Sequence, residues 1–244
     1  MKLAETVVHI PGKETDDWMD PKVLNDSKSH ADRLASHFSE HNAAHASTVK
    51  LYTGYGSRFI NAYHLHKAGV DISAGSYRDP QTIADARDAD GKMQAMMKDA
   101  PALPVKSHFY SGVGQKLGKH LATLKPGDPL HSPAYISYST SPLTAYQRGI
   151  QELESGDGDS INTPARLVRH VIHGEFEAGS RHGAYVGTQH SAFPAEREFV
   201  SNRGLQYEYV GSHEHVHPPI KTEREGTWQQ HITVVHTVRP VSSA

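Results

Sequence analysis

The hydrophobic pattern of the chain changes at Pro101, and this change constrains the fold more than any other feature. Before Pro101, apolar side chains recur at helical spacing over segments long enough for helices, and Met93, Met96 and Met97 are predicted to pack in the core. After it, short runs rich in aromatic and β-branched residues are separated by turns that contain glycine or proline, a pattern typical of strands. Helices followed by strands, without an internal repeat or a long linker, predict an α+β fold.

The chain is predicted to form a single domain at residues 21–244, with a helical layer at 21–100 and a strand-rich core at 101–244. A loosely attached arm, residues 1–20, precedes it and holds a short strand at Val7–Ile10. The predicted helices are 22–46, 58–68, 82–98 and 143–153. The predicted strands are 105–114, 134–143, 165–176, 183–188, 196–200, 205–211 and 230–240.

The composition excludes several classes of function. The 244 residues carry a net charge of −2, which does not provide the broad basic surface of a nucleic-acid-binding protein. The chain has no cysteine, so disulfides, thiolate zinc sites and cysteine nucleophiles are excluded. The N-terminal segment lacks the apolar core of a signal peptide, and no window is apolar enough to span a membrane. A cytoplasmic protein is therefore expected.

Nineteen histidines raise the question of a metal site. His41 and His45 have the i, i+4 spacing that shares a helix face, and His213, His215 and His217 alternate in a stretch interpreted as turn-like. Neither group contains the HExxH pattern, which supplies a glutamate base beside two histidine ligands. No metal site is predicted, and a histidine-based metal hydrolase is kept as an alternative.

Two carboxylates flank Arg197 in the stretch 190–204. The following Phe199 and Val200 favour a strand, in which Glu196 and Glu198 would point to the same face about 7 Å apart, at about 3.3 Å per residue. Two carboxylates on one face raise each other's pKa. Such a pair suits a site that accepts a proton or stabilises a developing positive charge. The alternative is a solvated strand edge with two surface glutamates.

Four segments, in this order, resemble the ADP-ribosyltransferase family of the arginine–serine–glutamate type, which includes clostridial binary-toxin enzymes and bacteriophage-encoded transferases that modify host proteins. The resemblance covers about residues 48–240. The segments are YTGYGSRFINAYHLHKAG (52–69), LPVKSHFYSGVG (103–114), Tyr138–Ser141 with Ala145, and residues 183–186 through 196–200 with Arg203 and Gly204.

The resemblance implies two packed β-sheets around an NAD cleft, with NAD as the substrate. By residue-for-residue match, Glu198 would stabilise the oxocarbenium-like ribose, Glu196 would orient and deprotonate the acceptor, and Ser139 would position the catalytic glutamate. The residues implied to contact NAD are Tyr110, Ser111, Gly112, Ser139, Thr140, Arg148 and Glu198.

One position departs from the family pattern. The arginine that follows the aromatic residue of the first core strand, and that grips the NAD phosphates, is replaced by Ser111. A guanidinium makes bidentate, charge-assisted contacts with phosphate that a serine cannot make. The candidates for this role are Lys106, His108, Lys116, Arg148 and the backbone N–H groups of the Gly112–Gly114 turn.

The resemblance also implies the acceptor. A glutamate at the position of Glu196 accompanies arginine acceptors in this family, because the guanidinium, with a pKa above 12, needs a neighbouring carboxylate to orient it and take its proton. The implied partner is a protein, for example a component of the host transcription or translation machinery, in the host cytoplasm if the chain is phage-encoded. Two alternatives stay open, an NAD glycohydrolase and a catalytically weak relative that only binds a partner.

Overall fold

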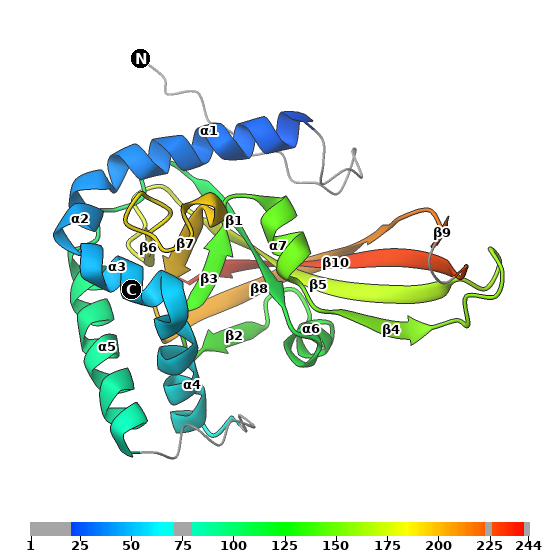
Figure 1. The fold of residues 1–244 in the computed structure, drawn as a ribbon, viewed down its shortest axis with the longest axis horizontal. Helices are drawn as coiled ribbons and strands as arrows, with labels where there is room; N and C mark the ends of the chain where they lie inside the picture. The colour runs from blue at the N-terminus through cyan, green and yellow to red at the C-terminus, as the bar shows by residue number, and fades with distance from the viewer. Residues whose placement is uncertain (1–20, 71–79, 223–225, 242–244) are drawn as a thin grey trace.

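The computed structural model describes residues 21–70, 80–222 and 226–241 of the chain. The predicted arm at 1–20 and its strand at Val7–Ile10 lie outside the described residues. The described part confirms the α+β fold, with helices gathered at one end of a large twisted sheet (Figure 1). None of the described helices has both the length and the apolar character needed to cross a membrane.

The N-terminal half is helical, as predicted. Its helices are α1 (Pro21–His37), α2 (Ser39–Ala44), α3 (Ala46–Leu51), α4 (Ser57–Lys67) and α5 (Pro80–Asp99), with a π-helical segment η1 (Tyr52–Gly56) between α3 and α4. Helix α4 ends before Gly69, whose φ of 77° is the left-handed conformation that glycine adopts readily after a helix. In α5, Met93, Met96 and Met97 are buried in the main core, which confirms their predicted packing role.

The strands form one hydrogen-bonded sheet in the order β2-β8-β10-β5-β1-β3-β7-β6, with β4 added to β5 and β9 added to β10. Strands β10 and β5 are parallel, whereas the other pairs are antiparallel. The strands are β1 (Ser107–Val113), β2 (Pro129–Ser132), β3 (Ile136–Ser139), β4 (Gln151–Ser155), β5 (Ala165–Phe176), β6 (Gly183–Tyr185), β7 (Glu198–Ser201), β8 (Leu205–Val216), β9 (Ile220–Lys221) and β10 (Trp228–Pro240).

The sheet folds back on itself between β1 and β7. Residues on strands two apart in a flat sheet are separated by about 9.5 Å, twice the interstrand spacing. Yet the ring of Phe109 on β1 stacks on the ring of Phe199 on β7 with centroids 4.1 Å apart, and Phe176 on β5 lies 5.0 Å from Phe199. The two sheets expected from the sequence therefore pack against each other as two parts of one continuous ladder, joined by the pair Tyr110 and Ser139 between β1 and β3.

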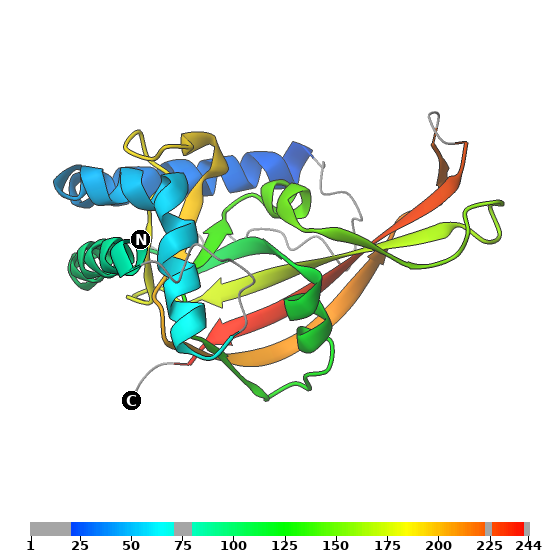
Figure 2. The same ribbon diagram turned by 60° about the horizontal axis from the view of Figure 1, so that its bottom comes forward.

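The helices and the outer strands lie at opposite ends of the molecule. Helices α1 to α5 surround the β3, β7 and β6 end, while β4, β5, β9 and β10 run out together as a long extension (Figures 1 and 2). Two short helices, α6 (Gln115–Leu121) and α7 (Pro142–Arg148), lie between these ends, and α7 packs against β1.

Three sequence expectations are corrected. The helix predicted at 143–153 ends at Arg148, because the following residues form β4 and pair with β5. The histidine run at 213–217 is not turn-like, since β8 extends through Val216 and pairs with β10 along most of its length. Helix α6 and strands β2 and β9 had not been predicted.

Candidate active site

The two glutamates do not lie on one strand, so the predicted strand at 196–200 begins two residues too early. Pro194–Glu196 forms a 3₁₀ turn, Arg197 adopts a left-handed conformation with φ of 52° and ψ of 50°, and β7 begins at Glu198. Proline favours the start of such a turn because its φ is already fixed near the helical value. The alternation of side chains along a strand therefore does not describe the spacing of Glu196 and Glu198.

Glu198 is a buried carboxylate, with 9% of its surface exposed. The pKa of this group is raised from 4.5 to about 7. Burial is the largest cause, a hydrogen bond with Ser137 lowers the pKa, the charge of Glu196 raises it and the charge of Arg148 lowers it. The charge of Glu196 therefore acts on Glu198, and the turn rather than a strand brings the two carboxylates together. A carboxyl group with a pKa near 7 changes its charge in the neutral pH range, which is a property of acid–base and charge-stabilising sites.

Ser139 is the direct cross-strand partner of Glu198 in the register of β3 and β7. Its hydroxyl donates to the backbone carbonyl of Glu196 at 2.6 Å and accepts the backbone N–H of Ser141 at 3.0 Å. Ser139 thus holds the 3₁₀ turn against β3. Ser139 is thus a strand neighbour of Glu198, while the hydrogen bond to the Glu198 carboxyl group comes from Ser137 and not from Ser139.

Ser137 is a site residue that the sequence reasoning missed. It lies two residues before Ser139 on β3, shares a hydrogen bond with the carboxyl group of Glu198, and its hydroxyl lies 3.2 Å from the hydroxyl of Tyr52 in η1. The negative charge of Glu198 is also one cause of the raised pKa of Tyr52. The period of two along a strand was the signal that could have identified Ser137, because it predicts that residues 137 and 139 share a face.

The residues after Ser139 connect β3 to α7. The side chain of Ser141 accepts the backbone N–H of Thr144 at 3.3 Å and so caps the N-terminus of α7. Thr140 donates its backbone N–H to the carbonyl of Arg197 at 3.2 Å. The hydroxyl of Thr140 is fully buried and has no hydrogen-bond partner among the described residues. Buried hydroxyls are normally paired, so this one is an exception.

Arg148, the last residue of α7, forms an ion pair with Glu196. Its charge also lowers the pKa of Glu198, so this guanidinium lies beside both carboxylates. Of the other basic residues proposed from the sequence, Lys106 pairs with Glu177 at 3.2 Å. Arg148 is therefore the candidate whose contacts place it at the two glutamates.

Tyr110, Ser111 and Gly112 lie side by side on β1. Tyr110 is buried, is the cross-strand partner of both Ser139 and His173, and stacks on the His173 ring at 5.0 Å. Ser111 is half-buried and, by alternation, lies on the other face of β1 from Tyr110. Gly112 leaves no room for a side chain, because a Cβ there would collide with the backbone of α7.

The two histidine groups noticed in the sequence differ in their surroundings. The ring nitrogens of His41 are bonded to the side chain of Asn42 at 3.1 Å and to the carbonyl of Met96 at 2.9 Å. The rings at 213 and 215 in β8 and at 217 just after it follow one another with centroids 5.5 and 6.4 Å apart. Neither group belongs to a set of three or more metal-ligand side chains with converging donor atoms in the described part of the chain.

The folded-back sheet, the helices around β3 and β7, and a buried glutamate opposite a serine define a class of protein: the chain has the ADP-ribosyltransferase fold. Vis toxin, an ADP-ribosyltransferase from Vibrio splendidus, matches at a TM-score of 0.54 with 18% identity over 97% of this chain and 90% of that one. An ADP-ribosyltransferase toxin from Paenibacillus larvae matches at a TM-score of 0.54 with 16% identity, over 89% of this chain and 97% of that one. An ADP-ribosyltransferase from Clostridium botulinum matches at a TM-score of 0.52 with 15% identity, over 86% of this chain and 95% of that one.

At these identities the likeness establishes the fold and leaves the chemistry to the residues of this chain. No family model matches the sequence. No curated protein matches it in sequence either.

Proposed function

We propose that this protein transfers ADP-ribose from NAD to an arginine side chain of an acceptor protein and releases nicotinamide. The observation that carries the proposal is the buried carboxylate of Glu198, which lies opposite Ser139 and beside the ion pair of Glu196 with Arg148. Two proteins of the same fold support the choice of substrates. A Staphylococcus aureus protein was solved with NAD, and Vis was solved in complex with agmatine, whose guanidino group is that of an arginine side chain.

NAD would supply a ribose carbon, C1′, whose bond to nicotinamide breaks with the electron pair leaving on nicotinamide. Glu198 stabilises the positive charge that develops on this carbon, since an ionised carboxylate with little solvent around it acts strongly on a nearby cation. Ser137 holds the Glu198 carboxyl group by a hydrogen bond, and Ser139 holds the turn that carries Glu196. Glu196 accepts the proton that the acceptor nitrogen loses as it bonds to C1′.

The residues present fit NAD at the ribose end and depart from the family at the phosphates. At the ribose end, Glu198 lies opposite Ser139 and is held by Ser137. Position 111 carries no guanidinium. Arg148 would supply the cation for the phosphates, because it already lies beside Glu196 at the end of α7.

The ion pair between Arg148 and Glu196 also bears on the acceptor. It supports a role for the Glu196 carboxylate as a binding group for a guanidinium. Agmatine in the Vis complex is a ligand with the same group. An incoming arginine would bind the carboxylate in place of Arg148, or share it, while Arg148 turns toward the phosphates of NAD.

The test is incubation of the protein with NAD labelled in the adenine moiety, with agmatine or a cell lysate as acceptor. Labelled ADP-ribosyl-agmatine and labelled protein are expected from the wild type. Glu198→Gln should lower the rates of both transfer and NAD hydrolysis by roughly 10²–10³-fold, the effect of losing one such electrostatic contact. Glu196→Gln should abolish transfer to guanidines and leave some hydrolysis. Identical profiles for the two variants would contradict the assigned roles.

The same assay separates the alternatives. Free ADP-ribose without a labelled acceptor identifies an NAD glycohydrolase, and neither product identifies a catalytically weak protein that only binds a partner. Loss of product on adding a chelator would favour the histidine-based metal hydrolase. A toxin-like or phage origin, an acceptor in the host transcription or translation machinery, and a location in the cytoplasm stay predictions from the sequence.

A further inference from the structure

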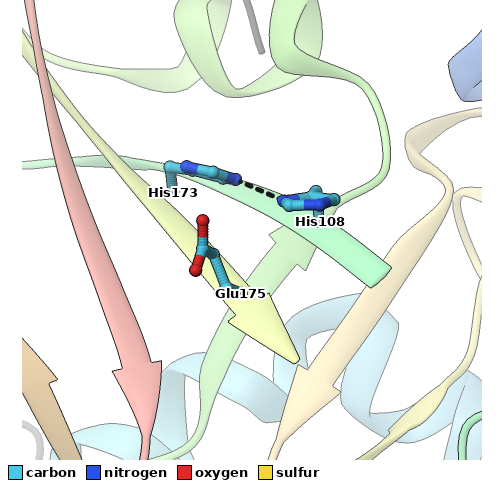
Figure 3. A group of neighbouring side chains, drawn as sticks. All are labelled: His108, His173 and Glu175. Carbon is cyan, nitrogen blue, oxygen red and sulfur yellow. Dashed lines mark hydrogen bonds between the residues drawn. The ribbon is translucent and has the colours of Figure 1, made fainter. Parts of the chain in front are cut away.

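Three potential metal ligands meet on one face of β1 and β5, outside the residues assigned to the proposed transfer reaction. His108 on β1 and Glu175 on β5 are direct cross-strand partners, and His173 lies two residues before Glu175 on the same face (Figure 3). One ligand atom from each residue lies within 4.8 Å of the other two. Two central strands of the sheet thus present two imidazoles and a carboxylate toward one point.

The arrangement is close to that of zinc ligands. The Nδ1 atom of His108 and the Nε2 atom of His173 point at each other across 2.9 Å (Figure 3). Two nitrogens bound to a tetrahedral zinc at about 2.0–2.1 Å would be about 3.3 Å apart. These two nitrogens form a hydrogen bond, so both could bind one ion once this bond is broken, the rings turn until their lone pairs converge beside the N–N line, and the nitrogens move apart by a few tenths of an ångström.

The groups around the three residues hold them in a form that can bind a metal. The Nδ1 atom of His173 lies 3.4 Å from the hydroxyl of Thr237, an outer contact that directs Nε2 toward His108. Arg239 donates to one oxygen of Glu175 at 2.7 Å, which leaves the other oxygen for a metal.

We propose that His108, His173 and Glu175 bind a zinc ion that clamps β1 to β5. Two imidazole nitrogens and one carboxylate oxygen form a ligand set suited to Zn²⁺ and poorly suited to Mg²⁺ or Ca²⁺, which prefer oxygen ligands. A water molecule would complete the four-coordinate site. The ion would fix β1 two residues before Tyr110, whose ring stacks on His173.

An ion can reach the site from the surface. His108 and His173 are buried, whereas Glu175 is only half-buried. Glu175 and Arg239 line one side of a cavity of about 380 Å³ whose other walls come from residues 177–182 and Pro240. The carboxylate therefore lies between the two buried imidazoles and an open cavity, which gives both an entry path and a place for the fourth ligand.

Zinc binding by the untagged full-length chain tests the proposal without any need for NAD. The protein is treated with a chelator, and Zn²⁺ is titrated in competition with a colorimetric zinc indicator. We expect one tight site per chain, a rise in Tm on adding Zn²⁺, and no competition from Mg²⁺ or Ca²⁺. Replacement by Co²⁺ should give the intense visible absorption of a tetrahedral ion.

The variants identify the ligands. Glu175→Gln preserves size and should weaken the tight site by at least about 10-fold, and His108→Gln should remove it together with the Co²⁺ absorption. Glu177→Gln is the matched control, because it removes a carboxylate two residues away that pairs with Lys106. His213→Gln tests whether the histidines of β8 supply the site instead. If His108→Gln does not fold, Glu175→Gln against Glu177→Gln decides the question.

Three results would overturn the proposal. These are a wild-type chain without a tight zinc site, a tight site that survives both Glu175→Gln and His108→Gln, and equal weakening by Glu175→Gln and Glu177→Gln. Loss of the site in His213→Gln, with Glu175→Gln unaffected, would move it to β8.

Discussion

Replacing Glu198 by glutamine should change how the stability of the protein depends on pH. In the native state burial holds the pKa of Glu198 at about 7, whereas in the unfolded chain it returns to about 4.5. Between these two pH values the native state binds more protons, so the free energy of unfolding falls as pH rises. The rise from 4.5 to about 7 corresponds to about 3 kcal/mol, at about 1.4 kcal/mol per pKa unit.

Glutamine cannot ionise, and its side-chain amide can still form a hydrogen bond with Ser137. We therefore expect the free energy of unfolding of Glu198→Gln, relative to that of the wild type, to increase by about 3 kcal/mol as pH rises from below 5 to above 7. Most of this increase should be complete by pH 8. Urea unfolding of both proteins at half-unit steps between pH 4 and 8.5 measures the difference, in which the other titrating groups largely cancel. A difference that stays constant across this range would refute a buried Glu198 with a raised pKa.

The remaining predictions concern the same site. The rate of NAD hydrolysis should change with pH near pH 7, where Glu198 titrates. Arg148→Ala should move this change to higher pH and Glu196→Gln to lower pH, because the charge of Arg148 lowers the pKa of Glu198 and that of Glu196 raises it. Shifts of both variants in the same direction would contradict this prediction. Because Ser111 lies on the face of β1 opposite Tyr110 and Ser139, Ser111→Arg should leave NAD affinity unchanged in a calorimetric titration; tightening of about 10- to 150-fold, the equivalent of a charged hydrogen bond of about 1.5–3 kcal/mol, would instead place position 111 at the phosphates. Gly112→Ala should lower the free energy of unfolding by about 1–3 kcal/mol in urea, since its Cβ would enter the backbone of α7, and a neutral effect would show that α7 can move.

The sequence predicted the parts of the fold that depend on local pattern. Helical spacing before Pro101 and alternation after it indicated the class and most elements, because each amphipathic segment must bury its apolar side. The same alternation in 134–143 and in the strand after Arg197 underlies the direct pairing of Ser139 with Glu198. The β8 extension was missed because polar histidines at 213–217 obscure a strand whose pairing with β10 stabilises it.

The turn at Glu196 depends on contacts that are distant in sequence. The hydroxyl of Ser139 binds the carbonyl of Glu196, and the backbone N–H of Thr140 binds the carbonyl of Arg197. These two bonds, from the last residue of β3 and the residue after it, accompany the left-handed conformation of Arg197, which is uncommon for a residue other than glycine. Local propensity favoured a continuous strand there, and tertiary hydrogen bonds stabilise the turn instead.

The group of His108, His173 and Glu175 illustrates a further limit of sequence reasoning. The two histidines are 65 positions apart, and only the register of β1 against β5 brings their rings together. That register also pairs Tyr110 with His173, and Tyr110 in turn pairs with Ser139 across the narrow link between the two parts of the sheet. A one-residue slip of β1 would move His108 and Tyr110 to the opposite face and separate both groups at once. The register that assembles the metal ligands therefore also sets Tyr110 beside Ser139, so whatever fixes β1 against β5 also fixes this wall of the candidate active site.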